Sequence, residues 1–301
     1  NYFQLGFLGV DIFFVLSGFL MFKYFINGVN YDSLKFFFLN RARRILPVYF
    51  FVSLLTIIVF YNKVLPHEFY VIFKSYFFNS IFLTNVSFWI DESYFGKIEL
   101  KPLLHFWSLA VEIQFYIFFP LIIYLLKKNK ISIYIVLLIS LTLYLVFNQI
   151  SQKTAFFLFP TRLWQFCLGI ICAYLFYSRK TKEKVKFTKY IGEISLILIV
   201  TIIFLFPIFF EKYVVEDRFA YFSIFISILT SLIIYFGFSE IIKDSILGKI
   251  FIRLGIYSFS IYAVHFPVIV FLNYIPFKGT NIHLSENLIF NSLLITLVFS
   301  F

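Results

Sequence analysis

The chain carries little charge and almost no sulfur. Charged side chains make up 14% of its 301 residues, and it holds two cysteines and one methionine. Soluble domains average about 25% charged residues, so this composition excludes an ordinary soluble enzyme. Cys167 and Cys172 lie five residues apart in one apolar segment and would face different sides of a helix, so they predict neither a disulfide nor a metal site.

Motifs of soluble catalysis are absent as well. The sequence contains no glycine-rich phosphate loop, no zinc-ligand spacing and no G-x-S-x-G nucleophile elbow. Such motifs hold nucleotide phosphates, catalytic metals and activated serines. Their absence argues against an ATP-driven pump, a zinc hydrolase or a fused esterase within these residues.

Apolar surface is what the chain has in abundance. Hydrophobic residues make up 61% of it, phenylalanine and tyrosine number 48 and 21, and the mean hydropathy is +0.93. The 26 basic residues exceed the 15 acidic ones, but they cluster in short loops, which indicates membrane topology rather than nucleic-acid binding. The composition therefore predicts a multi-spanning membrane protein.

Eight apolar runs are long enough to cross a bilayer, which takes roughly 17–25 helical residues, and a ninth ends with the chain. They lie at 5–26, 45–61, 105–126, 131–148, 156–177, 191–209, 219–237, 251–272 and 287–301. The prediction is an all-α integral membrane protein, a polytopic helical bundle with about nine membrane helices in this sequence.

The stretch 69–90 is apolar but interrupted by polar residues. They are Lys74, Asn79, Ser80, Thr84, Asn85 and Ser87. The basic loops at 27–44, 127–130 and 179–189 can all be cytoplasmic only if 69–90 does not cross completely. We therefore predict a re-entrant or interfacial segment. This topology also places Pro47 in the first turn of the helix it opens.

Two apolar runs carry histidines with polar residues at helical spacing. His105, Ser108 and Glu112 share one helical face, so the imidazole and the carboxylate could exchange or orient a proton. A buried carboxyl is expensive in a bilayer, which favours function, although an interfacial histidine and a structural glutamate would show the same spacing. Trp107 fits either this site or an aromatic belt.

The second histidine lies at His265. Ser258 and Tyr262 repeat the helical spacing before it, and Tyr257 adds a further polar group. Serine and tyrosine often only bond neighbouring membrane helices. Pro267 predicts a kink and a freed backbone carbonyl near His265, which would suit a polar site.

Three further charged positions stand out. Asp11 lies among glycines near the start of an apolar run. It is either a functional carboxylate or a negative charge that the helix dipole favours at a helix N-terminus. Arg162 opens a helix on the outer side, where we expect a carboxylate partner such as Glu112 or Asp11. Arg41 and Arg44 belong to a cytoplasmic basic cluster, which is either a topological anchor or a phosphate clamp.

Four strings in order resemble the membrane acyltransferase 3 family. They are GFLGVDIFFVLSGFL, RARRILPVYF, LLHFWSLAVEIQFYIFFP and YSFSIYAVHFP, and they extend from Gly6 to Pro267. The resemblance implies about ten membrane helices and transfer of an acyl group, often acetyl, from acyl-CoA to an extracytoplasmic saccharide. It implies acyl-CoA as donor substrate, no bound cofactor or metal, and residence in the inner (plasma) membrane. Arg41 and Arg44 match its donor-associated R-x-x-R motif, and His105 to Glu112 match its H-x-W-S-L-x-V-E pattern.

One feature of that family is missing. Its proposed catalytic histidine lies ten residues after an arginine, in a helix that would precede Gly6, so we expect this histidine upstream of Asn1. We therefore expect residues 1–301 to be one acyltransferase domain truncated at both ends, with the first helix missing, the last incomplete and no activity alone. The rival hypothesis is a transporter or flippase of lipid-linked saccharides, which intramembrane charges would also fit. A scaffold or sensor on the same fold is a weaker alternative.

Overall fold

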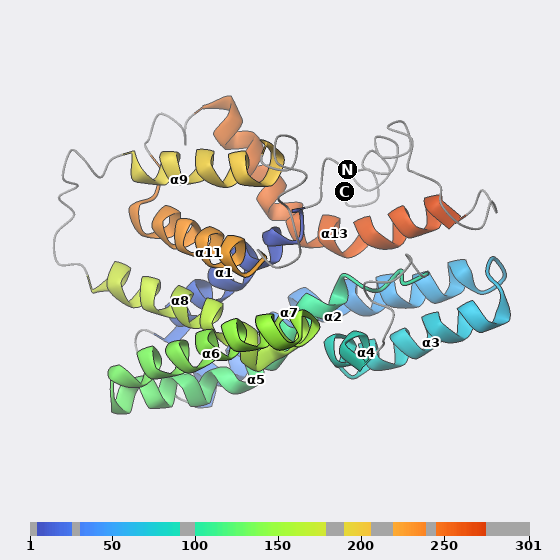
Figure 1. The fold of residues 1–301 in the computed structure, drawn as a ribbon, viewed down its shortest axis with the longest axis horizontal. Coiled ribbons are helices and arrows are strands. Elements are labelled where there is room, and N and C mark those ends of the chain that lie inside the picture. Colours follow the sequence, from blue (N-terminus) through green and yellow to red (C-terminus); the bar gives the residue numbers. More distant parts are fainter. Residues whose placement is uncertain are drawn as a thin grey trace. The chain divides into compact units, whose positions relative to one another are not determined.

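The computed structural model describes residues 5–25, 31–90, 100–178, 190–205, 219–238 and 245–274, and every regular element in these ranges is a helix (Figure 1). Five of them are long and apolar enough to cross a membrane. These are Leu34–Phe60, Phe106–Lys128, Ile131–Ile150, Phe159–Tyr177 and Gly248–Leu272, with shorter apolar helices at Ile191–Phe204 and Ala220–Phe236. The prediction of an all-α, multi-pass membrane protein is confirmed. The predicted run at 287–301 and the basic loop at 179–189 lie outside the described residues.

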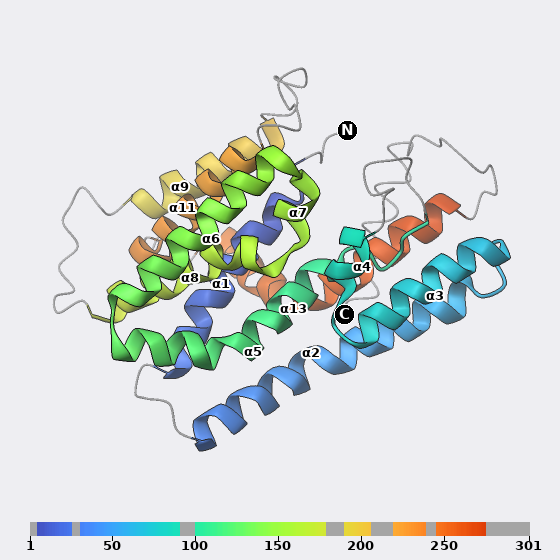
Figure 2. The same ribbon diagram turned by 60° about the horizontal axis from the view of Figure 1, so that its bottom comes forward.

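The chain divides into two compact units, residues 1–34 with 114–248 and residues 35–113 with 249–301. The first unit, called unit 1, contains the helices α1 (Leu8–Phe25), α6 (Ile131–Ile150), α7 (Gln152–Phe157), α8 (Phe159–Tyr177), α9 (Ile191–Val200), the π-helical η2 (Thr201–Leu205) and α11 (Phe219–Phe236). Helix α8 packs against α1, α6, α7 and α11, which makes it the centre of this unit (Figure 2).

Glycines let α1 and α8 approach closely. A Cβ atom on Gly18 would lie 2.1 Å from the backbone oxygen of Phe166, and one on Gly169 would lie 2.1 Å from that of Val15. The rings of Phe14 and Phe166 stack beside this crossing, with centroids 4.7 Å apart. Small residues at helix crossings are typical of membrane proteins, where close packing replaces the hydrophobic effect between helices.

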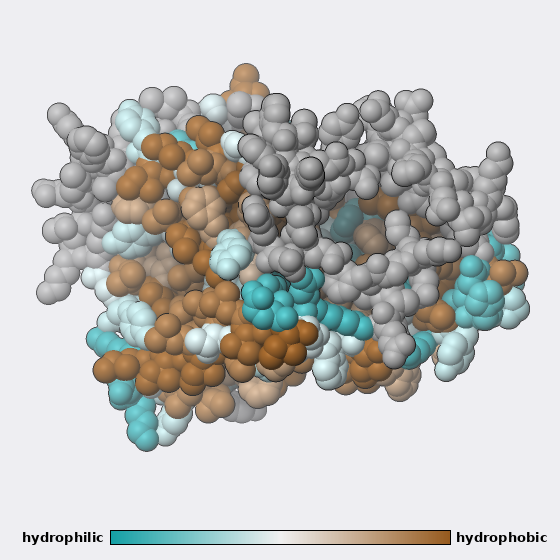
Figure 3. All heavy atoms as spheres, viewed as in Figure 1, coloured by the Kyte–Doolittle hydropathy of each residue, from teal (hydrophilic) through white to brown (hydrophobic). Residues whose placement is uncertain are grey.

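Large apolar side chains cover the outside of unit 1. Leu138 and Ile139 on α6 and Ile194 and Ile197 on α9 are exposed. Figure 3 shows hydrophobic residues, in brown, over much of the described surface in that view. Such contiguous apolar surface is rare on soluble proteins but is expected where lipid chains replace water.

Unit 2 contains most of α2 (Tyr31–Phe60), α3 (Pro66–Ser80), α4 (Thr84–Ile90), the start of α5 (Phe106–Lys128) and most of α13 (Ile246–Tyr274). The expectation that Pro47 lies in a first turn is wrong, because α2 begins at Tyr31 and Pro47 lies in its interior. Leucine, alanine and arginine, which favour helix, fill the turns before Pro47. Membrane helices tolerate an internal proline where neighbouring groups satisfy the freed carbonyl.

The stretch 69–90 is not one helix. Helix α3 ends at Ser80 and α4 starts at Thr84, and between them Phe82 has a φ of 58°, a left-handed conformation that side chains rarely adopt. Neither helix is among those long enough to cross a membrane. The segment is therefore two short helices rather than one, and its incomplete crossing, as a re-entrant or interfacial segment, stays a prediction.

Asn79 explains the polar residues of this stretch. Its side-chain nitrogen donates to Ser53 Oγ at 2.6 Å, and its side-chain oxygen accepts from Thr84 Oγ1 at 3.0 Å. The Tyr49 hydroxyl donates to both oxygens of Asn79, with the backbone oxygen at 2.8 Å. These bonds join α2, α3 and α4 through one buried amide, so part of the polarity that interrupts the apolar run is structural.

Candidate functional site

A buried ion pair joins α1 to α8 in unit 1. Arg162 Nη1 lies 3.1 Å from Asp11 Oδ1, and both side chains are about 3% exposed. The expectation of a carboxylate partner for Arg162 is confirmed, with Asp11 in that role. Asp11 precedes Gly18 by seven residues and Arg162 precedes Gly169 by seven, about two helical turns. Because α1 and α8 meet at these glycines, the same spacing in both helices brings the two charges together.

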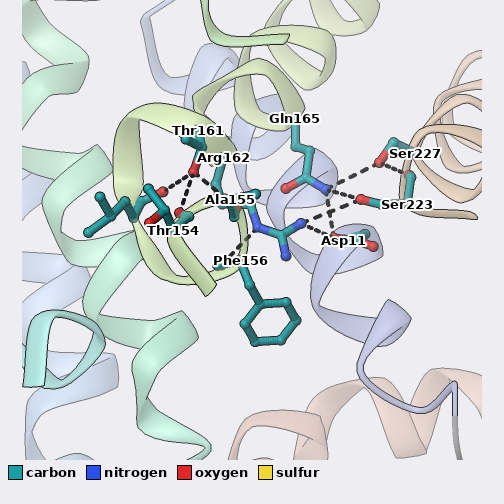
Figure 4. A network of polar contacts seen from close by, with 10 residues as sticks. Asp11, Thr154, Ala155, Phe156, Thr161, Arg162, Gln165, Ser223 and Ser227 are labelled. Carbon is teal, nitrogen blue, oxygen red and sulfur yellow. Dashed lines mark hydrogen bonds and ion pairs between the residues drawn. The ribbon is translucent and has the colours of Figure 1, made fainter. Parts of the chain in front are cut away.

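Neutral polar side chains complete this group, which we call the Asp11 network (Figure 4). Gln165 Nε2 donates to Asp11 Oδ1 at 2.6 Å and to Ser223 Oγ at 3.1 Å, and it lies 3.5 Å from Ser227 Oγ. Arg162 Nη1 also reaches Ser223 Oγ at 3.4 Å. Asp11, Arg162, Gln165, Ser223 and Ser227 thus connect α1, α8 and α11 inside the apolar unit.

The corner between α7 and α8 positions the guanidinium. Arg162 Nε donates to the backbone oxygen of Phe156 at 3.0 Å, and Thr161 Oγ1 lies 2.7 Å from that of Leu158. The guanidinium carbon also lies 5.1 Å and 5.0 Å from the ring centroids of Tyr144 and Phe156. Aromatic faces attract a desolvated cation, so the charge is stabilised on more than one side.

Two acceptor atoms of the Asp11 network remain open. Asp11 Oδ2 and Gln165 Oε1 are buried and have no hydrogen-bond partner among the described residues. Buried polar atoms are nearly always satisfied, so an unpaired one marks a possible functional position. The network can therefore accept hydrogen bonds from a donor such as a hydroxyl or an imidazole N–H.

Unit 2 brings the two histidine motifs together. His105 Nε2 lies 3.0 Å from the backbone oxygen of Ala263, and the rings of His105 and His265 have centroids 5.3 Å apart. Ser108 Oγ lies 2.6 Å from the Tyr262 hydroxyl, which also donates to the backbone oxygen of His105. We call His105, Ser108, Tyr262, His265 and the Ala263 carbonyl the His105 cluster.

Pro267 accounts for the carbonyl that His105 contacts. It lies inside α13 and has no N–H to bond the carbonyl four residues earlier, which is that of Ala263. The freed carbonyl expected near His265 is thus at Ala263. His265 Nδ1 lies 2.6 Å from the Tyr262 oxygen within the same helix. Each histidine therefore points one ring nitrogen at a carbonyl.

Other predicted site residues also lie in unit 2. Glu112 and Trp107 are buried in α5, with 3% and 5% exposure. Tyr257 is half-buried, whereas Ser258 is exposed and donates to the Gly255 oxygen of its own helix. The helical spacing thus correctly predicted that Tyr262 and His265 belong to one polar cluster, but Ser258 is not part of that cluster.

The arginines of α2 form a partly exposed row. Arg41 is half-buried with its guanidinium carbon 5.8 Å from the Phe37 ring centroid, and Arg43 and Arg44 are exposed. Arg41 and Arg44 are three residues apart on a helix and share a face. That geometry suits the two oxygens of a phosphate group.

The catalytic histidine that the family resemblance implies falls outside the described residues. The resemblance places it in a helix before Gly6, and the described part of the chain begins at Leu5. The place of this histidine therefore stays a prediction. Any role of His105 or His265 has to rest on the contacts that these two side chains make, and not on the resemblance.

Some participants were not predicted from the sequence. Gln165, Ser223 and Ser227 carry no motif, although an amide three residues after a buried arginine is a recognisable signal. The described residues contain no group of three or more His, Cys, Asp or Glu side chains that could hold a metal. Both cysteines are buried, and neither forms a disulfide.

Comparison with known proteins places the chain. A protein of Staphylococcus aureus strain COL, provisionally named as an O-acetyltransferase, is 34% identical over 294 residues. The O-acetyltransferase OatA of S. aureus strain NCTC 8325 / PS 47 is 32% identical over 288 residues. Each match covers 89% of this chain and 47% of the relative, so the chain spans about half the length of these curated relatives.

No solved structure matches the chain. The family model described as "Acyltransferase domain" matches residues 1–301, the whole of the sequence. It includes all four strings that carry the resemblance, together with the buried ion pair and the paired histidine motifs. The chain therefore belongs to the membrane acyltransferase 3 family.

Proposed function

We propose that the intact protein is a membrane O-acyltransferase. It moves an acyl group, in the first place acetyl, from acyl-CoA to a hydroxyl of an extracytoplasmic saccharide or cell-envelope glycan. The observation that carries the proposal is identity of 32–34% across 89% of the chain with proteins named as O-acetyltransferases. Buried polar groups inside a multi-pass apolar fold support it, because they are costly in a bilayer and accompany function.

The donor is assigned to the cytoplasmic side of the inner (plasma) membrane. Arg41 and Arg44 share a face of α2 and remain accessible enough to bind the phosphates of acyl-CoA. The acyl thioester enters between the helices, and the thiol of CoA leaves on the side from which it came. Each arginine that binds phosphate adds a charge-assisted contact and raises donor affinity.

The buried groups are assigned to the acceptor and to the chemistry. Asp11 and Arg162 form one rigid polar element, and Glu112 and His105 lie at the start of another helix. We assign His105 and Glu112, both in unit 2, to orienting the acceptor hydroxyl and the proton that it must lose when the ester forms. Orientation of this kind accounts for several orders of magnitude in enzymatic rates.

Transfer from labelled acetyl-CoA tests the proposal in membranes from cells that express the intact gene. Wild type should transfer label to a saccharide, and Arg41→Ala/Arg44→Ala should raise the KM for acetyl-CoA by about tenfold or more. The matched control is Arg43→Ala, which removes an exposed arginine of the same segment outside the R-x-x-R pattern. Absence of labelled saccharide with well-expressed wild type would contradict the proposal. Equal KM values in the double variant and the control would show that the two arginines act as topological anchors and do not bind the donor.

A further inference from the structure

His105 is held at both ends by one neighbouring helix. Its ring nitrogen Nε2 contacts the Ala263 carbonyl at 3.0 Å, and its own backbone carbonyl accepts from the Tyr262 hydroxyl. Both partners belong to α13. A side chain fixed at its backbone and at its ring tip has a defined orientation, as a group that must meet a substrate atom requires.

The Ala263 carbonyl also fixes the tautomer of the ring. A carbonyl oxygen can only accept a hydrogen bond, so Nε2 of His105 carries the proton. In a neutral imidazole the other nitrogen, Nδ1, then carries a lone pair. The proton position is thus a consequence of Pro267, because this proline leaves the Ala263 oxygen without its helical partner.

Nδ1 of His105 is buried and makes no hydrogen bond to any described residue. The side chain is 6% exposed, and Nδ1 has no hydrogen-bond partner among the described residues. Around it lie the Phe106 ring, with its centroid 4.1 Å from that of His105, and the Phe266 ring at 5.6 Å. An unpaired acceptor between aromatic rings is costly unless a donor occupies it at some stage of function.

The neighbouring His265 differs in this respect. Its Nδ1 donates to the Tyr262 carbonyl of its own helix, and the ring is half-buried rather than buried. It can shield His105 but does not present a comparable buried and unpaired nitrogen. The two histidines are therefore chemically distinct although their ring centroids are 5.3 Å apart.

We propose that Nδ1 of His105 accepts the proton of the saccharide hydroxyl that is acylated, with Pro267 as a positioning residue. This inference rests on the proposed function. As the hydroxyl oxygen forms the ester C–O bond, the thioester C–S bond breaks and the proton passes to Nδ1. The imidazolium is stabilised through Nε2–H and the Ala263 oxygen, and the proton then goes to the CoA thiolate, which leaves as the thiol. A base oriented by a third group is the general arrangement for activating a hydroxyl.

Two substitutions at the histidines separate this role from a structural one. Glutamine places an amide N–H near the position of Nε2, so His105→Gln retains a donor for Ala263 but has no basic nitrogen. A structural role predicts that His105→Gln is tolerated. The proposal predicts a fall in kcat of about 10²- to 10⁴-fold, the range for loss of a general base, with acetyl-CoA binding and thermal stability retained. His67→Gln, at an exposed histidine of α3, is the matched control and should leave kcat unchanged.

The positioning role of Pro267 has a spectroscopic signature. In intact protein labelled with [15N]histidine and held in lipid nanodiscs, His105 should show a protonated Nε2 and an unprotonated Nδ1; its signals are assigned by their loss in His105→Gln. Pro267→Ala supplies an N–H that competes for the Ala263 oxygen, so the tautomers should mix and transfer should fall by up to about 100-fold. Pro120→Ala, which removes a proline from α5, is the control and should leave the His105 signals in place.

The outcomes distinguish this inference from the proposed function. Wild-type protein that transfers no label contradicts the function and the inference with it. Wild-type transfer that persists within about threefold in His105→Gln contradicts the inference alone, and so does a protonated Nδ1 in the wild-type spectrum. Loss of transfer in His105→Gln with the donor still bound, together with the Nε2–H tautomer, supports it.

Discussion

The Asp11 network and the His105 cluster place polar groups inside apolar units by different means. The network is held by an ion pair and by side-chain hydrogen bonds among α1, α8 and α11. In the cluster all groups can be neutral, and four of its bonds end on backbone carbonyls. A charge needs another charge or several dipoles, whereas a neutral imidazole or phenol needs a single acceptor.

The difference indicates a division of work. A buried ion pair is rigid, because removing either partner leaves an uncompensated charge. The cluster is neutral until His105 takes up a proton, and Nδ1 of His105 is unpaired among the described residues, while Nε2 faces the Ala263 oxygen that would stabilise the imidazolium. We therefore expect substitutions in the network to act mainly on stability and those in the cluster mainly on catalysis.

The largest loss of stability is expected from breaking the ion pair. Arg162→Met leaves the Asp11 carboxylate buried without its partner and should lower the free energy of unfolding by about 3–5 kcal/mol. The double variant Asp11→Leu/Arg162→Met removes both charges and should recover most of that loss. Equilibrium unfolding in mixed micelles measures both. Arg253→Met, at an exposed arginine of α13, is the control and should stay within about 0.5 kcal/mol. A double variant no more stable than Arg162→Met would contradict this account.

A smaller loss is expected from separating the helices that carry the network. A Cβ on Gly18 meets the backbone oxygen of Phe166 at 2.1 Å, so Gly18→Ala must push α1 away from α8. Overpacking of this kind costs about 1–3 kcal/mol. Gly9→Ala in the same helix has nothing within 4 Å and should be neutral or slightly stabilising. Equal stability of the two alanine variants, measured by unfolding in mixed micelles, would show that the close crossing does not support the ion pair.

Sequence periodicity predicted much of the fold, because membrane helices must be long and apolar. The runs at 105–126, 131–148 and 219–237 match α5, α6 and α11 to within a few residues. The run at 156–177 divides at Leu158 into α7 and α8, which hydropathy alone does not resolve because both sides of the break are apolar. The early start of α2 was missed for the opposite reason, since basic residues continue a helix that apolar length does not detect.

The candidate site was predictable where an isolated charge required a partner. Arg162 required a carboxylate, and Asp11 and Glu112 were the two alternatives. The choice between them depends on the Gly18 and Gly169 crossing, which is a packing relation between distant segments. Gln165 contributes an uncharged side chain, and Ala263 contributes only its backbone. Such groups have no composition signal, except that Pro267 indicates a freed carbonyl four residues before it.

The smallest effect on stability is expected in the His105 cluster. Tyr262→Phe removes the bonds to Ser108 and to the His105 carbonyl and keeps the ring, so the free energy of unfolding should fall by about 1 kcal/mol, as for single hydrogen bonds in membrane proteins. Tyr221→Phe, at an exposed position of α11, is the control and should be neutral. Because the Tyr262 hydroxyl fixes the backbone end of His105, acyl transfer should fall further than stability does. A loss of stability as large as that of Arg162→Met, with transfer unchanged in the folded fraction, would show that both clusters are structural and would remove the contrast between them.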